Sequence, residues 1–281
     1  MILIADSGSS KCDWAFIDKG INKLKIIQTI GFNPYFIDSE RIIEELNNSS
    51  DLLNISKCVK KVFFYGAGCS DDFKKNILNK VLSIFFVNAE IIIEHDLLGA
   101  CRSIYNNETT INCIIGTGSI ACLYKHGKVK LSVPSLGYIL GDEGSGNYFG
   151  KKILNLYLTK KLTQEIEKDF KKSYNVSYEL VMKKVYNNER SNYFLSSFFP
   201  FFIKHKKNPL FLNIIEEEIL KFLNIHVFSI SNYQDYKINF FGSVSLQLKD
   251  IIVDILKEKK CKIGLFVNKP IHRLFDYHYK K

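Results

Sequence analysis

Two stretches of this chain, one at its start and one near its middle, share the same design. Residues 1–20, MILIADSGSSKCDWAFIDKG, place an apolar strand before a short Ser/Gly/Lys loop, and a second strand follows. Residues 111–130, INCIIGTGSIACLYKHGKVK, repeat the strand, a Gly/Thr/Ser loop, the second strand and a tight glycine turn. Any two β-hairpins look somewhat alike, but the matching loop composition favours an internal duplication into two related domains.

The order of elements in each half predicts an α/β fold. Three meandering strands come first in each half, and strands then alternate with helices. We expect an N-terminal domain at 1–108 and a C-terminal domain at 109–281 that carries a helical insertion. In the second half the pattern predicts a third strand at 129–135 and helices at 144–162 and 213–228. These domain boundaries leave open whether the last helix packs back on the N-terminal domain.

Composition excludes several classes of protein. Of the 281 residues 46% are hydrophobic and 24% are charged, and no apolar run is long enough to span a membrane. The chain starts directly in a strand pattern without a secretion signal, so we expect a cytoplasmic protein that binds no membrane. Seven cysteines without a C-x-x-C pair argue against a disulfide framework or a zinc ribbon. The net charge of +10 is spread along the chain, which argues against nucleic-acid binding.

The two glycine-rich loops predict a binding site for a polyphosphate. Such a loop turns several backbone N–H groups in one direction, and with hydroxyl groups and a lysine these make a concave anion site. Two loops of this kind, one in each domain, are suited to grip the phosphates of a nucleotide from both sides. The expected phosphate-binding residues are Gly8, Ser9, Ser10 and Lys11 in the first loop and Gly116, Thr117, Gly118 and Ser119 in the second.

Acidic residues stand at the ends of two predicted strands. Asp6 closes the first strand, where a carboxylate beside phosphates serves Mg²⁺, usually through water; the alternative is a turn-capping Asp. Asp96, in EHDLLGACR, ends a strand just before a helix. Open α/β sheets present functional side chains to a cleft at such positions, although an Asp there is equally suited to be an ordinary N-cap.

Two further segments combine glycine with polar residues. The stretch PSLGYILGDEGSGNYFGKKIL, at 134–154, joins a strand to a helix and contains Asp142 and Glu143. It forms a polar helix start that suits an anion or a hydroxyl group. In FFGSV, at 240–244, Gly242 and Ser243 let the backbone lie close to a flat ligand such as adenine. An ordinary strand-to-helix turn with Ser243 as N-cap explains that segment equally well.

Together these motifs resemble the BadF/BadG/BcrA/BcrD ATPase family and, within it, the bacterial N-acetylglucosamine kinase-like proteins. The resemblance covers essentially the whole chain, through ADSGSSKCDW, GFNPYF, EHDLLGACR, IIGTGS, LGYILGDEGSG and FFGSV. It places the chain in the acetate and sugar kinase/actin superfamily. That membership implies two ribonuclease-H-like domains with ATP in the cleft between them, and a homodimer is compatible with it.

The resemblance also implies roles for individual residues. Asp96 would be the catalytic base for the 6-hydroxyl of a sugar, Ser10 and Thr117 would bind phosphates, and Asp6 would support Mg²⁺. The residues expected to hold the sugar are Asn33, Asp96, Ser135, Leu136, Gly137 and Asp142. Ile120 stands where the sugar-kinase members often carry Asn, which removes a polar contact near the ligand.

The sequence therefore predicts an ATP- and Mg²⁺-dependent kinase that phosphorylates an amino sugar, with N-acetylglucosamine as the first candidate. One alternative is an ATPase that energises a partner protein, as the activators of 2-hydroxyacyl-CoA dehydratases do. Another is a non-catalytic sensor of sugars or nucleotides on a kinase-derived scaffold. Three acidic residues, Asp6, Asp96 and Asp142, favour the kinase, because a protein that only binds has no need of a base.

Overall fold

The computed structural model describes residues 1–18, 20, 22–186 and 190–279. The chain divides into two compact units. The first comprises Met1–Glu108, His126–Val129 and Lys269–Lys281, and the second comprises Thr109–Lys125 and Lys130–Asn268. The first unit therefore contains both the start and the end of the chain.

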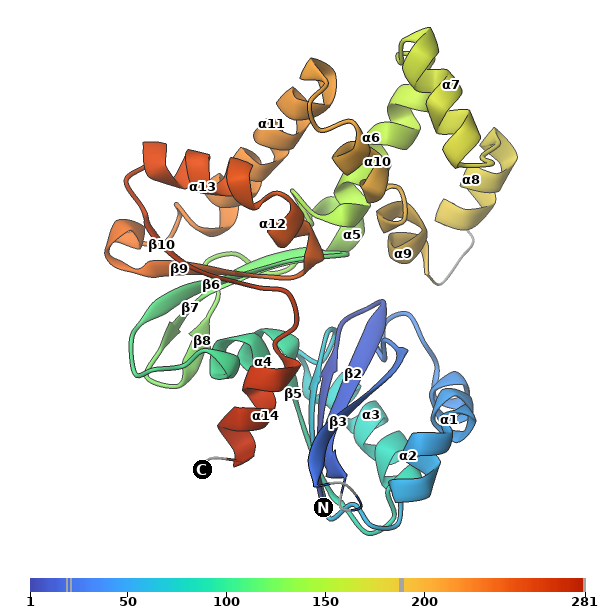
Figure 1. Cartoon of the computed structure of the whole chain (residues 1–281), viewed down its shortest axis with the longest axis vertical. Helices are drawn as coiled ribbons and strands as arrows, with labels where there is room; N and C mark the ends of the chain where they lie inside the picture. The colour runs from blue at the N-terminus through green and yellow to red at the C-terminus, as the bar shows by residue number, and fades with distance from the viewer. Residues whose placement is uncertain (19, 21, 187–189, 280–281) are drawn as a thin grey trace. The chain divides into compact units, whose positions relative to one another are not determined.

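The first unit is built on a five-stranded sheet with the order β3-β2-β1-β4-β5, of which Figure 1 labels β2, β3 and β5. Strand β1 (Ile2–Ser7) pairs antiparallel with β2 (Lys11–Asp18), which pairs antiparallel with β3 (Lys23–Ile30). On its other side β1 runs parallel to β4 (Lys61–Gly66), and β4 runs parallel to β5 (Glu90–His95). The carboxyl ends of β1, β4 and β5 consequently lie at the same edge of this sheet.

Side chains of this sheet alternate between two cores, as the two-residue period of a strand requires. Leu3, Trp14 and Phe64 face helices α1 (Ser39–Asn48), α2 (Ser50–Ile55) and α3 (Asp72–Phe85). Their neighbours Ile4, Ala15 and Tyr65 pack with α14 (Ile271–Tyr279), which in turn contacts α4 (Asp96–Ser103). The sheet is therefore covered on both faces, which fits its continuous apolar strands.

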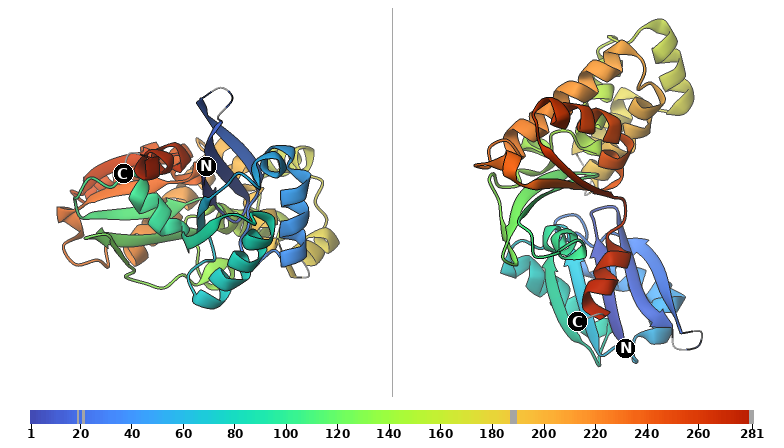
Figure 2. Two further views of the ribbon diagram at one scale, coloured as in Figure 1. Left: turned by 90° about the horizontal axis from the view of Figure 1, so that it is seen from below. Right: turned by 60° about the vertical axis from the view of Figure 1, so that its left-hand side comes forward.

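The last helix is fixed in the first unit by a polar contact as well as by its apolar face. The Tyr65 hydroxyl lies 2.8 Å from Nε2 of His278 and accepts a hydrogen bond of 2.8 Å from Nη1 of Arg102. The His278 ring also stacks on Phe63 with the ring centroids 3.8 Å apart. This helix thus closes one face of the first sheet, as Figure 2 shows in its right-hand view.

A second sheet has the same arrangement, and all of it except residues 128 and 129 belongs to the second unit. Its strands are β6 (Thr110–Ile115), β7 (Ser119–Lys125), β8 (Lys128–Lys130), β9 (Lys237–Phe241) and β10 (Lys262–Val267), in the order β10-β9-β6-β7-β8. Strand β6 is antiparallel to β7 and parallel to β9. Counted along the chain, the strand order in both sheets is third, second, first, fourth, fifth. The expected α/β fold of two related ribonuclease-H-like domains is confirmed.

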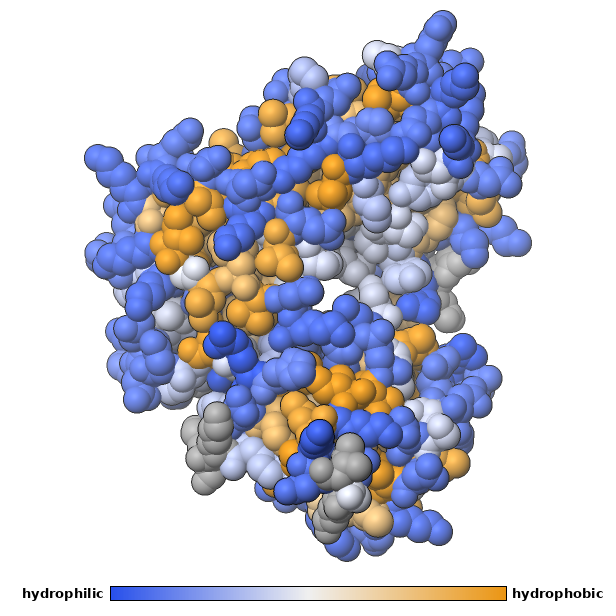
Figure 3. Space-filling view, viewed as in Figure 1, coloured by the Kyte–Doolittle hydropathy of each residue, from blue (hydrophilic) through white to orange (hydrophobic). Residues whose placement is uncertain are grey.

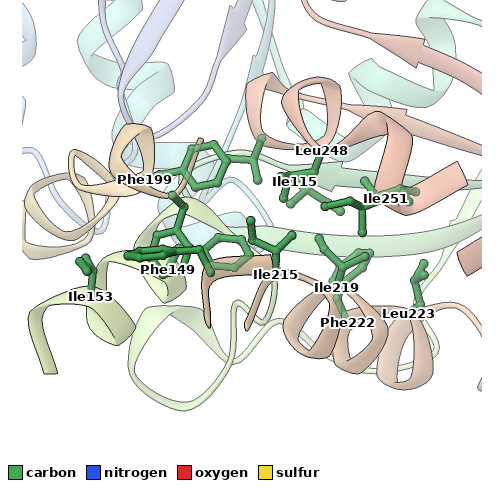
Figure 4. Packing of buried hydrophobic residues seen from close by; sticks show 14 of the residues in the cluster. Ile115, Phe149, Ile153, Phe199, Ile215, Ile219, Phe222, Leu223, Leu248 and Ile251 are labelled. Carbon is green, nitrogen blue, oxygen red and sulfur yellow. The ribbon is translucent and has the colours of Figure 1, made fainter. Parts of the chain in front are cut away.

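The segment between β8 and β9 is helical and supplies most of the second core. Phe149, Ile215, Ile219 and Phe222 from this segment pack together, with Ile115 of the sheet in the same core (Figure 4). The helices of this unit are α5 (Gly137–Leu140), α6 (Gly146–Leu158), α7 (Gln164–Ser173), α8 (Tyr178–Tyr186), α9 (Ser191–Ser196), α10 (Phe199–Lys204), α11 (Pro209–His226), the 3₁₀ turn η1 (Tyr233–Asp235), α12 (Ser243–Gln247) and α13 (Lys249–Glu258).

Three of the expected boundaries in this unit are wrong. The strand expected at 129–135 ends at Lys130, and Pro134 could not have continued it because it has no N–H to donate to a ladder. The helix expected at 144–162 begins only after Ser145, whose Oγ accepts a 3.3 Å hydrogen bond from the Tyr148 N–H, and it ends at Leu158. The helix expected at 213–228 begins at Pro209, where a proline needs no hydrogen-bond partner.

Polar side chains cover most of the face shown in Figure 3. In the described part of the chain, no helix combines the length and the apolar character needed to cross a membrane.

Candidate functional site

The first expected phosphate loop is a tight turn between β1 and β2. The Gly8 N–H donates to the Lys11 carbonyl at 3.0 Å, which closes the turn. Behind it, a Cβ on Gly31 would lie 2.1 Å from the Gly8 carbonyl oxygen, so the following segment packs directly on this loop. Nδ2 of Asn33 donates to Oγ of Ser9 at 2.8 Å. The structure therefore brings Asn33, expected to contact the sugar, against the loop expected to bind phosphate.

A group of carboxylates lies beside this loop. Asp6 and Asp13 face each other across β1 and β2, and Asp96 is close enough to act on Asp6 by charge. Burial raises the pKa of Asp6 to about 7, and the charges of Asp96 and Asp13 add to this effect. Asp13 itself is buried, accepts a 2.7 Å hydrogen bond from Gln28 and lies 3.3 Å from Nζ of Lys269.

Asp96 is the first residue of α4, at the carboxyl end of β5. Its Oδ1 accepts a 2.8 Å hydrogen bond from the Leu97 N–H and lies 2.9 Å from Nδ1 of His95. Burial disfavours the charged imidazole, but the nearby carboxylate outweighs it and raises the pKa of His95. The Leu97 N–H also lies 3.1 Å from Nδ1 of His95, so this nitrogen accepts from Leu97 in the neutral ring and donates to Oδ1 of Asp96 in the imidazolium. The carboxylate is thus held in one orientation by its own helix start.

The residues of this unit suit a Mg²⁺ ion held largely through water. Mg²⁺ keeps several waters and takes one or two carboxylates together with substrate phosphates. Asp6 offers such a carboxylate next to the loop, with Asp13 opposite to it in the neighbouring strand. Among the described residues, no three His, Cys, Asp or Glu side chains are grouped closely enough to hold a metal ion directly.

The second expected phosphate loop is joined to the start of α6. The Gly116 N–H donates to the Gly118 carbonyl at 2.9 Å, and the Gly146 N–H donates to the Gly116 carbonyl at 2.8 Å. The Thr117 carbonyl accepts from the backbone N–H of Asn147 at 3.0 Å and from its Nδ2 at 2.7 Å. These bonds fix the loop's carbonyl groups on one side, so its geometry is set before any ligand binds.

Asp142 lies at the centre of this arrangement in a strained backbone conformation. Its φ is +61°, which few residues other than glycine adopt. Its Oδ1 accepts from the Ser119 N–H at 3.2 Å and its Oδ2 accepts from Nδ2 of Asn147 at 2.7 Å. Burial raises the pKa of Asp142, and these hydrogen bonds oppose the rise. A Cβ on Gly118 would lie 2.9 Å from the Asp142 carboxylate, so any larger residue here would displace that carboxylate.

The expected adenosine segment meets the same loop. Gly242 has a φ of +100°, and a Cβ there would lie 2.5 Å from the Ile115 carbonyl oxygen. Gly242 and not Ser243 is the N-cap of α12, and Ser243 is exposed at the first position of the helix. The structure therefore brings Gly116–Ser119, Asp142 and Gly242 together in the second unit.

Ser135, Leu136 and Asp142, all expected on the sugar side, line one small cavity in the second unit. Gly137, with a φ of +67°, starts α5 just beyond it. The other two residues expected to contact the sugar, Asn33 and Asp96, belong to the first unit.

Sequence reasoning missed four residues of these sites. Asp13 had a signal, because an acid in the middle of an apolar strand is unusual. His95 also had a signal in the sequence, because it stands next to the candidate base Asp96. Nothing in the sequence pointed to Lys269, which pairs with Asp13 from the far end of the chain. Nothing pointed to His226 either, which ends a long amphipathic helix and lines the cavity.

Comparison with solved structures identifies similar proteins. A structure from Porphyromonas gingivalis, described as a "Putative N-acetylglucosamine Kinase", is 32% identical, with 100% of this chain and 99% of that chain covered and a TM-score of 0.89. A "Putative N-acetylglucosamine Kinase" from Chromobacterium violaceum shares the fold at 12% identity, with 98% of each chain covered and a TM-score of 0.63.

The actin-like fold extends to more distant structures. MreB 5 of Spiroplasma citri, solved with AMPPNP, is 14% identical, with 99% of this chain and 96% of that chain covered and a TM-score of 0.54. No family model and no curated protein matches this sequence. The full-length match at 32% identity nonetheless shows the family, and the chain belongs to the bacterial N-acetylglucosamine kinase-like proteins of the acetate and sugar kinase/actin superfamily.

Proposed function

We propose that this protein is a sugar kinase that transfers the γ-phosphate of ATP to the 6-hydroxyl of an amino sugar, with N-acetylglucosamine as the first candidate. The observation that carries the proposal is the oriented carboxylate of Asp96. It stands at the end of β5, bound by the Leu97 N–H and His95, in the same unit as the phosphate-loop turn. The full-length relative described as such a kinase supports the same reaction.

In this proposal Asp96 orients the acceptor hydroxyl and takes its proton. Among the described residues both fixed contacts of the carboxylate go to Oδ1, which leaves Oδ2 to face the hydroxyl group. Oδ2 accepts the hydroxyl proton as the sugar oxygen forms its bond to phosphorus and the bond from phosphorus to ADP breaks. General base assistance of this kind contributes about 10²–10⁴-fold.

The glycine-rich loops bind the nucleotide. Their backbone N–H groups, together with Lys11, offset the negative charge of the transferring group, which is most of what a phosphoryl-transfer enzyme has to do. Mg²⁺ bound with ATP would supply further charge neutralisation, and Asp6 is the residue that would hold it, mainly through water. The proposed nucleotide contacts are Gly8, Ser9, Ser10, Lys11, Gly116, Thr117, Gly118, Ser119, Gly242 and Ser243.

The proposed sugar contacts, like the proposed nucleotide contacts, come from both units. Asn33 and Asp96 come from the first unit, whereas Ser135, Leu136, Gly137 and Asp142 come from the second. Asp142 keeps its carboxylate oxygens within hydrogen-bond reach of Ser119 and Asn147, so its position is fixed independently of the sugar.

ADP release, measured with a coupled assay, tests the proposal. The panel contains N-acetylglucosamine, N-acetylmannosamine, glucosamine and glucose, with a blank that lacks sugar. We expect release to depend on sugar and to be fastest with N-acetylglucosamine. Release that is equally fast in the blank would replace the kinase with an ATPase. Thermal stabilisation by a sugar without any ADP release would replace it with a sensor.

A further inference from the structure

A second and larger pocket shares Glu143 with the small cavity beside Asp142. Its volume is about 450 Å³, and small-molecule sites measure roughly 300–1,000 Å³. Helices α5, α6 and α11 of the second unit, which Figure 1 labels, contribute most of its wall. The residues that line it are Ile139, Leu140, Glu143, Tyr148, Lys151, Lys152, Asn155 and Lys221. None of them is a proposed nucleotide or sugar contact, so the pocket is a separate candidate site.

The spacing of residues along α6 brings two lysines against one tyrosine. Residues three and four apart lie on the same face of a helix, so Lys151 and Lys152 stand next to Tyr148. Their Nζ atoms lie 4.5 Å and 5.6 Å from the centre of the Tyr148 ring. Lys221 comes from α11, with its Nζ 5.2 Å from the same ring centre, and donates a 2.9 Å hydrogen bond to the Tyr148 hydroxyl. Three ammonium groups therefore surround one aromatic ring.

Two of these three cations have no acidic partner. Lys152 is paired with Glu218 at 2.6 Å. Lys151 instead donates to the Tyr138 carbonyl at 2.6 Å, and among the described residues neither Lys151 nor Lys221 forms an ion pair. Burial lowers the pKa of Lys151, although more distant carboxylates oppose this. A partly desolvated cation without a counter-ion is costly, and an anion in the pocket would remove that cost.

The pocket also offers neutral hydrogen-bond donors. The Tyr148 hydroxyl accepts from Lys221, and its own hydrogen has no acceptor among the described residues. Asn155, two turns further along α6, adds a side-chain amide to the wall. One residue of the wall is acidic: Glu143 is 9% exposed, and its Oε2 lies 3.8 Å from Nε2 of His226, which lines the small cavity. The charge of Glu143 is thus partly taken up outside this pocket.

The size and the rim of the pocket suit an anion that carries an organic group. Ile139 and Leu140 of α5 are 73% and 74% exposed there and offer an apolar surface. A phosphate monoester has a charge of about −1.5 to −2 at pH 7, which suits the two unpaired cations, and an uncharged body for the rim. We propose that this pocket binds the phosphate group of a small phosphorylated compound, between Lys151 and Lys221. The proposal does not depend on which reaction the protein catalyses.

Calorimetric titration with two probes tests the proposal. Inorganic phosphate represents the charged group alone, and N-acetylglucosamine 6-phosphate adds an organic body. Each probe is titrated into the full chain in the presence of Mg²⁺ and a saturating non-hydrolysable ATP analogue, which keeps the glycine-rich loops occupied. We expect each probe to bind at one site, and the ester to bind more tightly than inorganic phosphate.

Substitutions of the unpaired lysines locate the bound probe. Lys151→Met and Lys221→Met, singly and together, keep an apolar stem and remove the ammonium group. The double variant should bind both probes about tenfold more weakly or less, because two charge-assisted contacts are lost. Its affinity for the ATP analogue should not change. Lys168→Met, at an exposed position in α7, is the matched control and should bind both probes like the wild type.

Melting temperatures show whether each variant is folded, and Lys221→Met decides the question if Lys151→Met is not, because Lys221 is exposed. Wild-type protein that binds neither probe would overturn the proposal. Binding that is equally tight in the double variant would also overturn it, since the anion would then lie elsewhere. Lysine-dependent binding with equal affinity for the two probes would support the site and make inorganic phosphate its ligand.

Discussion

The two units share one sheet order but use the ends of their strands differently. In the first unit, three carboxylates lie beside the loop between β1 and β2: Asp6, Asp13 and Asp96. The charges of Asp13 and Asp96 act on Asp6 and raise its pKa. In the second unit the equivalent loop carries glycines, and hydrogen bonds tie its carbonyl groups to the start of α6. The first unit thus supplies a group of carboxylates that act on one another, and the second supplies a fixed backbone around Asp142 and a cavity. Duplication conserves the sheet and leaves the loops free to take different chemical roles.

The largest effect should follow the loss of the carboxylate in the first unit. Asp96→Asn keeps the shape of the side chain but cannot take a proton, so sugar-dependent kcat should fall by about 10²–10⁴-fold while ATP affinity stays nearly unchanged. Steady-state kinetics and calorimetric titration with ATP measure the two quantities. Asp72→Asn, on an exposed residue of the same unit, is the matched control. Unchanged turnover in Asp96→Asn would remove that residue from the role of base.

In the second unit a backbone change should matter most. Gly242→Ala forces a side chain into a φ of +100° and to within 2.5 Å of the Ile115 carbonyl oxygen, so we expect a loss of about 3 kcal/mol in unfolding free energy. Thermal and urea unfolding measure this loss. Gly116→Ala is the control in the same region, because a Cβ there meets nothing within 4 Å. Equal stability of the two variants would show that the fixed backbone is not what distinguishes this unit.

The pH dependence of stability should expose the carboxylates of the first unit. Asp6 has a pKa of about 7 in the folded protein and 3.8 as an ordinary carboxyl. Between these values the folded form keeps a proton that the unfolded form has released, so the free energy of unfolding falls as pH rises.

Without metal, wild-type protein should therefore lose about 2 kcal/mol or more between pH 4 and pH 7 relative to Asp6→Asn, since one pKa unit corresponds to about 1.4 kcal/mol. Urea unfolding across this range provides the comparison. Parallel curves for the two proteins would mean that the Asp6 carboxyl is not perturbed by its surroundings.

The smallest effect should come from His95, which positions Asp96 from within the same unit. His95→Ala removes the 2.9 Å contact to Oδ1 but leaves the Leu97 N–H in place, so kcat should fall about tenfold with KM for ATP unchanged. The fall in kcat should be largest at low pH. There the raised pKa of His95 keeps the imidazolium paired with Asp96, and this pair is lost as pH rises through that pKa. His272→Ala, at an exposed position in α14, is the control. A rate equal to that of the wild type across pH would assign His95 a purely structural role.

The sequence predicts the strands better than the contacts made between distant residues. Apolar periodicity places β1, β4 and β6, and the glycine loops place the two turns, because these features depend on neighbours in the chain. Pro134 cannot belong to the strand expected at 129–135, because it lacks the backbone N–H that a ladder uses, and periodicity does not include this requirement.

Long-range contacts account for the residues that sequence reasoning missed. Lys269 meets Asp13 only because the end of the chain folds back into the first unit. His226 reaches the cavity only because α11 packs under the loop that contains Glu143. Neither contact leaves a local pattern, so both require the structure.

The destination of the γ-phosphate tests the central claim most directly. Wild-type protein is given ATP labelled in that group, with Mg²⁺ and N-acetylglucosamine, and the products are separated by chromatography and mass. The account predicts that the label appears on the 6-oxygen of the sugar in step with ADP. Label that appears as inorganic phosphate, at a rate indifferent to sugar, would contradict it.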